Sequence, residues 1–242
     1  MSKRNKLFLF LIFLISGFLY YLIFFVDNKN EDNNFITEEV IVKKVIDGDT
    51  IELFDGRKIR MIGINTPEKG KFSSLESLNF TKNLENKTII IMYRETDRYE
   101  RILGYILFNN EIFNKKILEE GLAHLYYYKK DNFYDEMKEA EEFARQNKKG
   151  IWKQSKDKPC VSLLKFEYKE KTKRCNNEEI LILNNSCNKT IFAFIKDDST
   201  KHFYIELKKG LFSKNFSCVF NDDGDSLYIW DEEGLLLFYR YP

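Results

Sequence analysis

Short β-branched segments separated by tight turns fill residues 38–108 and constrain the fold more than any other feature of the chain. The Asp55-Gly56 dipeptide is a strong hairpin signal between two of them. Helical spacing follows, and Asp131 or Asn132 could cap the last helix. The expected strands are 40–46, 50–54, 57–64, 88–93 and 102–108, and the expected helices are about 75–84, 113–120 and 131–147. Five strands in a tight meander with helices on one side predict an α+β fold on a five-stranded β-barrel of OB type.

A polar stretch at residues 153–159 predicts a domain boundary. Beyond it the pattern changes to strands alone, separated by turns such as Asp223-Gly224 and Glu233-Gly234. The expected strands are about 161–168, 179–184, 191–196, 203–207, 216–220, 226–230 and 235–239. Short strands at this spacing predict an all-β sandwich. We therefore divide the chain into an amino-terminal segment at 1–37, a barrel domain at 38–155 and a sandwich at 156–242.

The amino-terminal segment contains an uncharged, mostly apolar run at residues 7–26. A helix over this run spans roughly 30 Å, the thickness of the hydrocarbon layer of a membrane. Lys3, Arg4 and Lys6 precede the run, so the positive-inside rule places the amino terminus in the cytoplasm. We expect a transmembrane helix that anchors the chain in the cell membrane in a single pass, with the rest extracytoplasmic. The alternative is a cleaved signal peptide and secretion, although the run is longer than usual and no A-x-A site follows it.

Four cysteines lie in the last third of the chain, and none of them forms a C-x-x-C pair. An even number in an exported module fits two disulfides, with three possible pairings. Buried free thiols are the alternative. The cysteines are Cys160, Cys175, Cys187 and Cys218.

Charge and histidine content exclude several classes of function. Lys and Arg number 39 against 38 Asp and Glu, and residues 38–155 hold 21 of each sign. Such a balance argues against a broad basic surface that tracks nucleic acid electrostatically, so any anion binding must be local. With His124 and His202 as the only histidines, chemistry built on a histidine pair is not expected.

Three polar clusters remain as candidates for chemistry. They are Asp47-Gly48-Asp49-Thr50, then Arg60 with Asn65-Thr66-Pro67-Glu68, and then Thr96-Asp97-Arg98-Tyr99-Glu100-Arg101. Taken singly, they fit a turn, the entry to a helix and a solvated charged face. Taken in order, and with Gly121-Leu122-Ala123 and Gly150-Ile151-Trp152, they resemble the staphylococcal nuclease (thermonuclease) family over about residues 38–153.

The resemblance implies a calcium-dependent nuclease that hydrolyses DNA or RNA to 3′-phosphate products with little sequence specificity. It implies Asp49, Asn65 and Thr66 as Ca²⁺ ligands, with Asp47 acting through water. Glu68 would orient or deprotonate the attacking water, and Arg60 and Arg101 would clamp the phosphate. The implied substrate-binding residues are Arg98, Tyr99, Tyr126 and Tyr128, since rings can stack on bases. The three tyrosines at 126–128 could equally be core or surface, and their register is open by one residue.

Two positions depart from the family pattern. Asn65 stands where well-known members have Asp, which keeps an oxygen ligand but removes one negative charge. Glu100 stands where those members often have Gly, and its carboxylate could pair with Arg101 and weaken the phosphate clamp.

The sandwich resembles the lamin-tail domain, an immunoglobulin-like fold. The residues that carry this resemblance are those at 177–185, 207–210 and 224–234. It implies a binding or anchoring role for the module at a surface or on nucleic acid.

Two other functions stay open beside an exported, monomeric nuclease. The first is a catalytically inactive barrel that binds nucleic acid or protein at the cell surface, and the second is a structural surface protein whose working part is the sandwich. The retained acids and arginines favour the enzyme.

Overall fold

A computed structural model of the chain describes residues 35–127, 129–168, 179–198, 202–221 and 225–241. The described residues from Thr37 onward form one compact unit. The predicted membrane helix at 7–26, together with Tyr128 and Cys175, lies outside the described residues. Within the described ranges, no helix has the length and apolar character needed to cross a membrane. The domain boundaries at 37 and 155 stay predictions.

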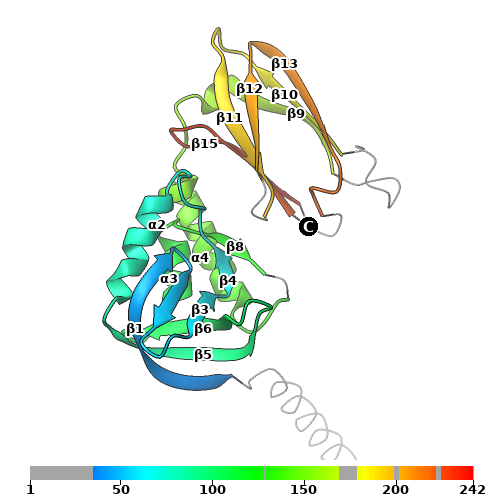
Figure 1. Cartoon of the computed structure of the whole chain (residues 1–242). Helices are drawn as coiled ribbons and strands as arrows, with labels where there is room; N and C mark the ends of the chain where they lie inside the picture. Colours follow the sequence, from blue (N-terminus) through cyan, green and yellow to red (C-terminus); the bar gives the residue numbers. More distant parts are fainter. Residues whose placement is uncertain (1–34, 128, 169–178, 199–201, 222–224, 242) are drawn as a thin grey trace, which may run out of the picture. The chain divides into compact units, whose positions relative to one another are not determined.

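Five strands close into a barrel, as the sequence predicts (Figure 1). Strand β1 pairs with β2 and lies beside β5, β2 pairs with β3, and β5 pairs with β6. A parallel pairing of β3 with β6 closes the ring. The bounds are β1 Ile36–Asp47, β2 Thr50–Leu53, β3 Lys58–Met61, β5 Thr88–Thr96 and β6 Ile102–Phe108, with a short β7 at Glu111–Ile112 beside β6. Alternate β-branched and apolar residues fill the barrel because successive side chains of a strand point to opposite faces.

The predicted strand at 57–64 is divided in two. Gly63 has a φ of 76°, so the chain turns after β3 and begins a new strand, β4 (Gly63–Asn65), which pairs with β8 (His124–Tyr126). A Cβ at Gly63 would lie 2.7 Å from the hydroxyl oxygen of Tyr127. Only glycine therefore fits, both for its backbone conformation and for the close approach of this ring.

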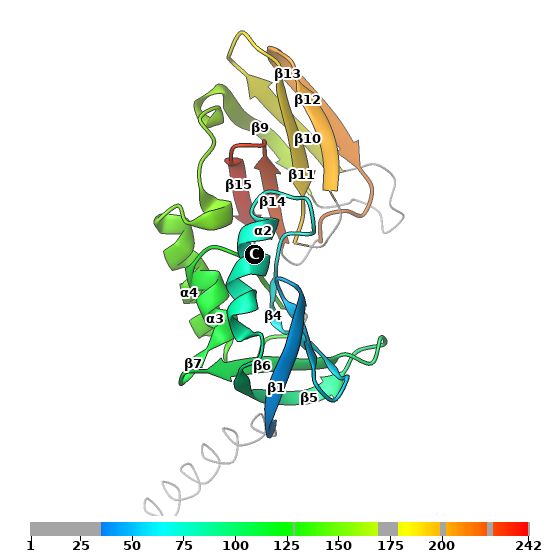
Figure 2. The same cartoon turned by 60° about the vertical axis from the view of Figure 1, so that its left-hand side comes forward.

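The helices pack on one side of the barrel (Figure 2). They are α2 (Ser74–Thr81), which runs into the 3₁₀ turn η1 (Lys82–Leu84), then α3 (Phe113–Glu119) and α4 (Tyr134–Gln146). The fully buried Asn114 of α3 joins helix and barrel, because its amide donates to the Ile62 carbonyl (2.8 Å) and accepts from the Ile106 N–H (2.9 Å). The expected cap by Asp131 or Asn132 is wrong, because the N-cap residue of α4 is Phe133 and no side chain caps this helix. Asp131 instead accepts the N–H of Phe133 in the turn before α4.

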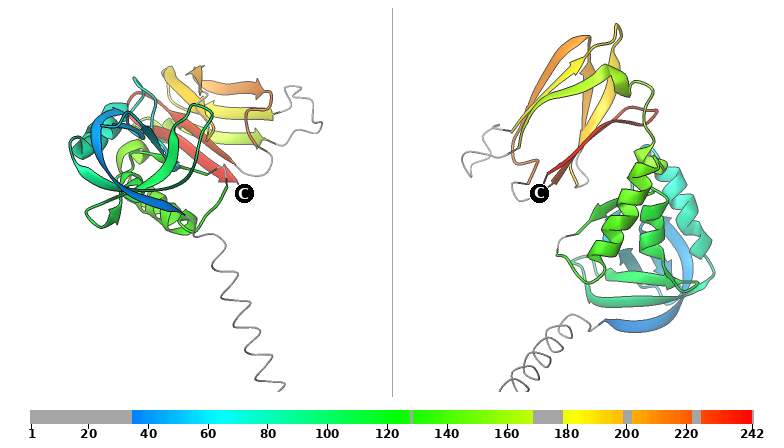
Figure 3. Two further views of the ribbon diagram at one scale, coloured as in Figure 1. Left: turned by 60° about the horizontal axis from the view of Figure 1, so that its bottom comes forward. Right: turned by 180° about the vertical axis from the view of Figure 1, so that it is seen from behind.

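The last third of the chain forms two antiparallel sheets that share one hydrophobic core (Figure 3). The sheet orders are β13-β10-β9 and β12-β11-β14-β15. The bounds are β9 Val161–Glu167, β10 Glu179–Asn185, β11 Ile191–Lys196, β12 His202–Leu207, β13 Gly210–Phe216, β14 Asp225–Trp230 and β15 Leu235–Tyr241. Leu181 and Leu183 of one sheet meet Ile195 and Ile229 of the other in this core. Two packed sheets are the arrangement that the sequence predicts.

One predicted strand is wrong. The segment 216–220 is expected to be a strand, whereas the strand is β13 at Gly210–Phe216, paired with β10 along its whole length. The buried Glu179 accepts the N–H groups of Val219 (3.0 Å) and Phe220 (2.9 Å). These backbone donors therefore bind a carboxylate instead of a neighbouring strand, and the chain leaves the sheet after Phe216.

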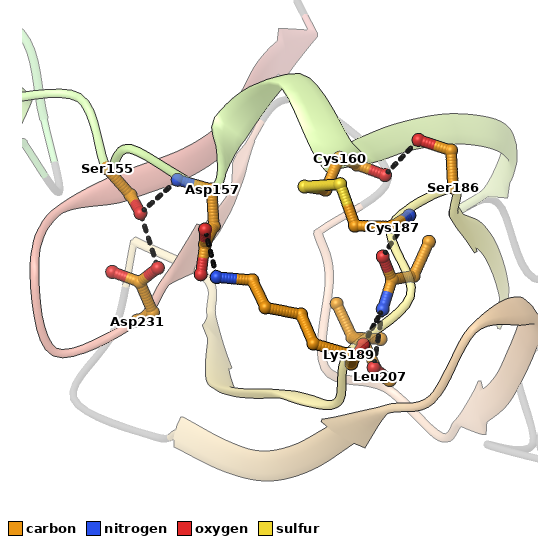
Figure 4. The surroundings of a disulfide bond; sticks show 9 residues. Ser155, Asp157, Cys160, Ser186, Cys187, Lys189, Leu207 and Asp231 are labelled. Atoms are coloured by element: carbon orange, nitrogen blue, oxygen red, sulfur yellow. Dashed lines mark hydrogen bonds and ion pairs between the residues drawn. A yellow bond between two sulfur atoms is a disulfide. The ribbon is translucent and has the colours of Figure 1, made fainter.

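A disulfide links Cys160 to Cys187 with a Cα–Cα distance of 5.2 Å. It joins the turn η3 (Lys158–Cys160) to the segment after β10, where the Ser186 hydroxyl also donates to the Cys160 carbonyl (Figure 4). Cys218 is disulfide-bonded as well. Disulfide bonding is therefore confirmed for Cys160, Cys187 and Cys218. The observed Cys160–Cys187 bond agrees with one of the three pairing schemes that the sequence left open.

A second buried cluster connects α4 and the turn η2 (Gly150–Trp152) to strands β14 and β15. Trp152 packs with Tyr228 and Trp230, and the Trp230 indole N–H donates to the Ile151 carbonyl (3.0 Å). Glu141 of α4, fully buried, forms an ion pair with Arg240 of β15. This packing extends to β8 because Glu141 also accepts the N–H of Leu125 (2.7 Å).

Candidate active site

The carboxylate of Asp49 is the meeting point of the first two sequence clusters. Asp49 lies in the turn between β1 and β2 and is only 6% exposed. One of its oxygens accepts the backbone N–H and the hydroxyl of Thr66, both at 2.8 Å. The other lies 3.2 Å from the Arg60 Nε and accepts the Thr50 hydroxyl. Residues from three separate segments thus converge on one buried acid.

Arg60 bridges the two strongest candidate ligands. Its guanidinium contacts Asp49 through Nε, and another nitrogen lies 3.4 Å from the side-chain oxygen of Asn65. A third donates to the carbonyls of Met61 and Ile64 (3.0 Å to the latter). The planar guanidinium group of Arg60 is therefore held at the end of β3, against the oxygens that a cation would use.

Asp47 lies beside this group, and its Oδ1 accepts the N–H of Asp49 (3.1 Å). Partial desolvation, followed by the nearby charge of Asp49, raises the pKa of Asp47 to about 6. Asp47 is an exposed residue whose carboxylate contacts the backbone of Asp49. Two neighbouring acids disfavour each other's charge and leave room for a compensating cation.

The residues present fit a hard divalent cation. Asp47 and Asp49 offer carboxylate oxygens, Asn65 an amide oxygen and Thr66 a backbone carbonyl, and Ca²⁺ accepts all three kinds of donor. Across the described residues there is no cluster of three or more His, Cys, Asp or Glu that could hold a metal. A cation here would therefore depend on neutral oxygens as well as on carboxylates.

The third sequence cluster forms the turn between β5 and β6. Its Arg101 precedes β6, and the parallel pairing of β6 with β3 brings it beside the strand that carries Arg60. Asp97 accepts the Arg101 Nε at 2.8 Å and forms an ion pair with another guanidinium nitrogen at 2.7 Å. Partial burial opposes ionisation of Asp97, but the bonds from Arg101 outweigh it and lower the pKa of that carboxyl.

The partner of Arg101 is a residue that the sequence reasoning missed. The expectation names Glu100, whereas Asp97 makes the contact, and the i,i+4 spacing was the available signal. Glu100 instead occupies the left-handed region with a φ of 61°. This backbone conformation favours glycine.

The exposed ring of Tyr99 lies between two guanidinium groups. The Cζ atoms of Arg98 and Arg101 are 4.8 Å and 5.6 Å from its centroid. The structure therefore brings these three candidate substrate residues together on one turn.

Glu68 follows β4 and is exposed, and it contributes to a pocket. Its carboxylate makes no hydrogen bond or ion pair within the described part of the chain. The pocket is also lined by Lys71, His124, Lys196 and Trp230, so residues from β11 and β14 lie near this acid. None of the sequence motifs indicates that β11 and β14 lie near Glu68.

Of the three tyrosines at 126–128, the structure describes two. Tyr126 is exposed on β8, opposite Gly63. The hydroxyl of Tyr127 lies 2.6 Å from that of Tyr105, which donates to Asp131. Tyr127 is thus fixed beside β4. Successive residues of an extended segment point to opposite sides, so Tyr126 faces solvent while Tyr127 faces the protein.

The oxygen donors and two arginines on the loops of this OB-type barrel suit the binding of a phosphate ester, since a guanidinium matches two phosphate oxygens. A model of the family described as staphylococcal nuclease homologue matches residues 58–154. The thermonuclease of Staphylococcus hyicus is 39% identical over an alignment of 138 residues that covers 52% of this chain and 78% of the relative. The thermonuclease of Staphylococcus intermedius is 37% identical over 48% of this chain and 76% of its own length. An uncharacterized endonuclease of Escherichia coli is 35% identical over 46% and 74%.

The chain therefore belongs to the staphylococcal nuclease family, and it is a nuclease-type hydrolase. The match to the family model ends at residue 154, before the two-sheet region, so the family assignment concerns the barrel.

Proposed function

We propose that this chain is an exported, membrane-anchored, calcium-dependent nuclease that cleaves DNA and RNA to 3′-phosphate products with little sequence specificity. The observation that carries the proposal is the convergence of Arg60, Thr66 and Asn65 around the buried Asp49. Because the charged groups of this site suit a phosphate and not a base edge, sequence readout is not expected.

Asp49, Asn65 and Thr66 would hold the Ca²⁺, with Asp47 acting through a water molecule. The ion would supply positive charge that neutralises the phosphoryl oxygens. Arg60 already contacts Asp49 and Asn65, so its guanidinium lies beside the proposed ion and can donate to the same phosphate.

Glu68 would orient or deprotonate the attacking water. It follows Thr66 by two residues and its carboxylate is solvent-exposed. Arg101 would clamp the phosphate from the other side, with its fork oriented by Asp97. The arrangement separates a buried acid that binds the ion from an exposed acid that meets water.

The proposed export rests on the apolar run at 7–26 and its flanking cations. The Cys160–Cys187 disulfide supports it, since such bonds persist in oxidising compartments. Secretion after cleavage of the run is the alternative localisation. The two-sheet region, with its resemblance to lamin-tail domains, would bind or anchor the monomeric enzyme.

A barrel that binds nucleic acid without cleaving it is the second candidate. The Asn at position 65 favours it, because a missing charge weakens metal binding. The presence of Asp49, Glu68, Arg60 and Arg101 favours the enzyme.

The experiment is digestion of plasmid DNA and of RNA by the full chain, purified in mild detergent, with Ca²⁺ or with a chelator. We expect cleavage in Ca²⁺ alone, and a loss of about 100-fold or more in Arg60→Ala and Glu68→Ala. Arg57→Ala serves as the control, because Arg57 pairs with the surface acids Glu38 and Asp55. Equal digestion by all variants would refute the site, and binding without cleavage in saturating Ca²⁺ would select the second candidate.

A further inference from the structure

The outer face of the sheet β12-β11-β14 is unusually aromatic. The inner side chains at 191, 193 and 195 of β11 lie in the core between the sheets, so Phe192 and Phe194 point outward. Phe194 is directly paired with Tyr204 on β12 and with Trp230 on β14. An antiparallel sheet normally presents polar residues on a face that is not packed.

Only one half of this outer face is covered. Tyr228 and Trp230 are buried against the cluster around Trp152. Phe192 and Tyr204, by contrast, are 64% and 70% exposed. Large exposed rings that continue a buried aromatic row mark an interaction site more often than chance.

The exposed rings line a groove of about 610 Å³. Lys71 and Phe72, three and four residues after Glu68, form its other wall. Lys71, Phe72 and Phe194 also line the smaller pocket that contains Glu68, so the groove and the pocket are continuous.

The rings form a continuous row across the strands. The centroids of Phe194 and Tyr204 are 6.4 Å apart, and those of Phe194 and Trp230 are 5.4 Å apart. The Lys71 ammonium lies 4.7 Å from the Tyr204 centroid and brings a positive charge to the row. Aromatic rings beside cations are how proteins hold single-stranded nucleic acid without reading its sequence.

The charges of the groove indicate which way a strand would lie. Glu206, Asp231 and Glu232 line the groove together with Lys71, whereas Lys71 and Lys196 line the pocket that contains Glu68. The Asp231 carboxylate is occupied by the Ser155 hydroxyl and by the N–H of Gly234 (2.9 Å). Bases therefore fit against the rings, and the phosphates fit toward the lysines.

We propose that Phe192, Phe194 and Tyr204, together with Lys71 and Phe72, form a platform that stacks the bases of a single-stranded part of the substrate next to Glu68. This inference rests on the proposed nuclease function and gives the two-sheet region a direct part in substrate binding. It makes the enzyme favour long single strands over short ones.

The test uses the full chain in mild detergent and a labelled 20-nucleotide single strand. In a chelator, fluorescence anisotropy should show about tenfold weaker binding for Phe192→Ala and for Tyr204→Ala, since each ring stacks one base. Tyr204→Phe keeps the ring but loses the hydroxyl that accepts a hydrogen bond from Lys71, so it should lose clearly less binding than Tyr204→Ala. Leu211→Ala is the matched control, because Leu211 is 75% exposed on β13 of the other sheet.

Cleavage in Ca²⁺ provides the second readout. The ratio of kcat/KM for the 20-nucleotide strand to that for a dinucleotide should fall about tenfold per ring removed. Unchanged binding and an unchanged ratio would overturn the platform. Cross-linking would also overturn the platform if the parent formed a dimer and the double variant Phe192→Ala/Tyr204→Ala stayed a monomer. The aromatic face would then bind a second copy of the chain. If nothing is cleaved but the binding losses appear, the platform stands and the proposed catalysis fails.

Discussion

Replacing Arg240 by Met should destabilise the chain more than the loss of an ordinary surface ion pair. Glu141 is completely buried, and Arg240 neutralises its charge. Removing one partner of a buried pair typically costs about 3–5 kcal/mol. The Arg240 side chain is 29% exposed, so solvent shields part of the charge and we expect about 3 kcal/mol. For a chain of this size that corresponds to a melting temperature lower by about 6–12 °C.

Thermal and urea unfolding followed by circular dichroism measure this loss. Arg57→Met is the matched control, because Arg57 is 34% exposed and its partner Glu38 is 38% exposed, so this loss should stay below about 1 kcal/mol. In Glu141→Gln the amide still accepts the Leu125 N–H, and the double variant should cost less than the sum of the singles by about 1–3 kcal/mol. Equal losses for Arg240→Met and Arg57→Met would refute the reasoning.

Three further changes test other parts of the account. Glu100→Gly should stabilise the chain by up to about 1 kcal/mol in a thermal melt, because it relieves a φ of 61°; a clear loss would contradict this. Burial, then the charges of Lys196 and Arg240, lowers the pKa of His124. Below pH 6.5 His124 binds a proton in the unfolded chain but not in the folded chain. The free energy of unfolding should therefore fall by up to about 1.4 kcal/mol per pH unit as the pH drops, and His124→Phe should lack this contribution. Asn65→Asp should reach half-maximal cleavage at about tenfold lower Ca²⁺, and an unchanged requirement would remove Asn65 from the ligand set.

Local patterns predict the barrel and most strands of the two sheets well. Period-two alternation and the Asp55-Gly56 turn suffice to place the strands, because each side chain's face follows from its position. The ordered clusters also bring Asp49, Arg60 and Thr66 into one site, since each lies in a strand or directly after one.

Features that depend on contacts between distant segments escape the sequence. The break at Gly63 requires the ring of Tyr127, which lies far along the chain. The end of β13 depends on the carboxylate of Glu179, which draws backbone donors away from the sheet. The ion pair of Glu141 with Arg240 joins residues 99 positions apart, and no local spacing announces it.

The choice of partner within a cluster also needs the structure. Both Asp97 and Glu100 lie close to Arg101 in the sequence, and the turn geometry selects Asp97. Backbone conformation therefore decides between two acids that composition cannot separate.

The most direct test of the central claim is cleavage of an end-labelled single strand by the parent chain and by Asp49→Asn in a Ca²⁺ titration. Asp49 links the proposed ion to Arg60 and Thr66. We predict that the parent cleaves in Ca²⁺ to fragments with 3′-phosphate ends and that Asp49→Asn, although folded, needs far more Ca²⁺ or does not cleave. Cleavage by Asp49→Asn at the Ca²⁺ concentration that suffices for the parent would contradict the account.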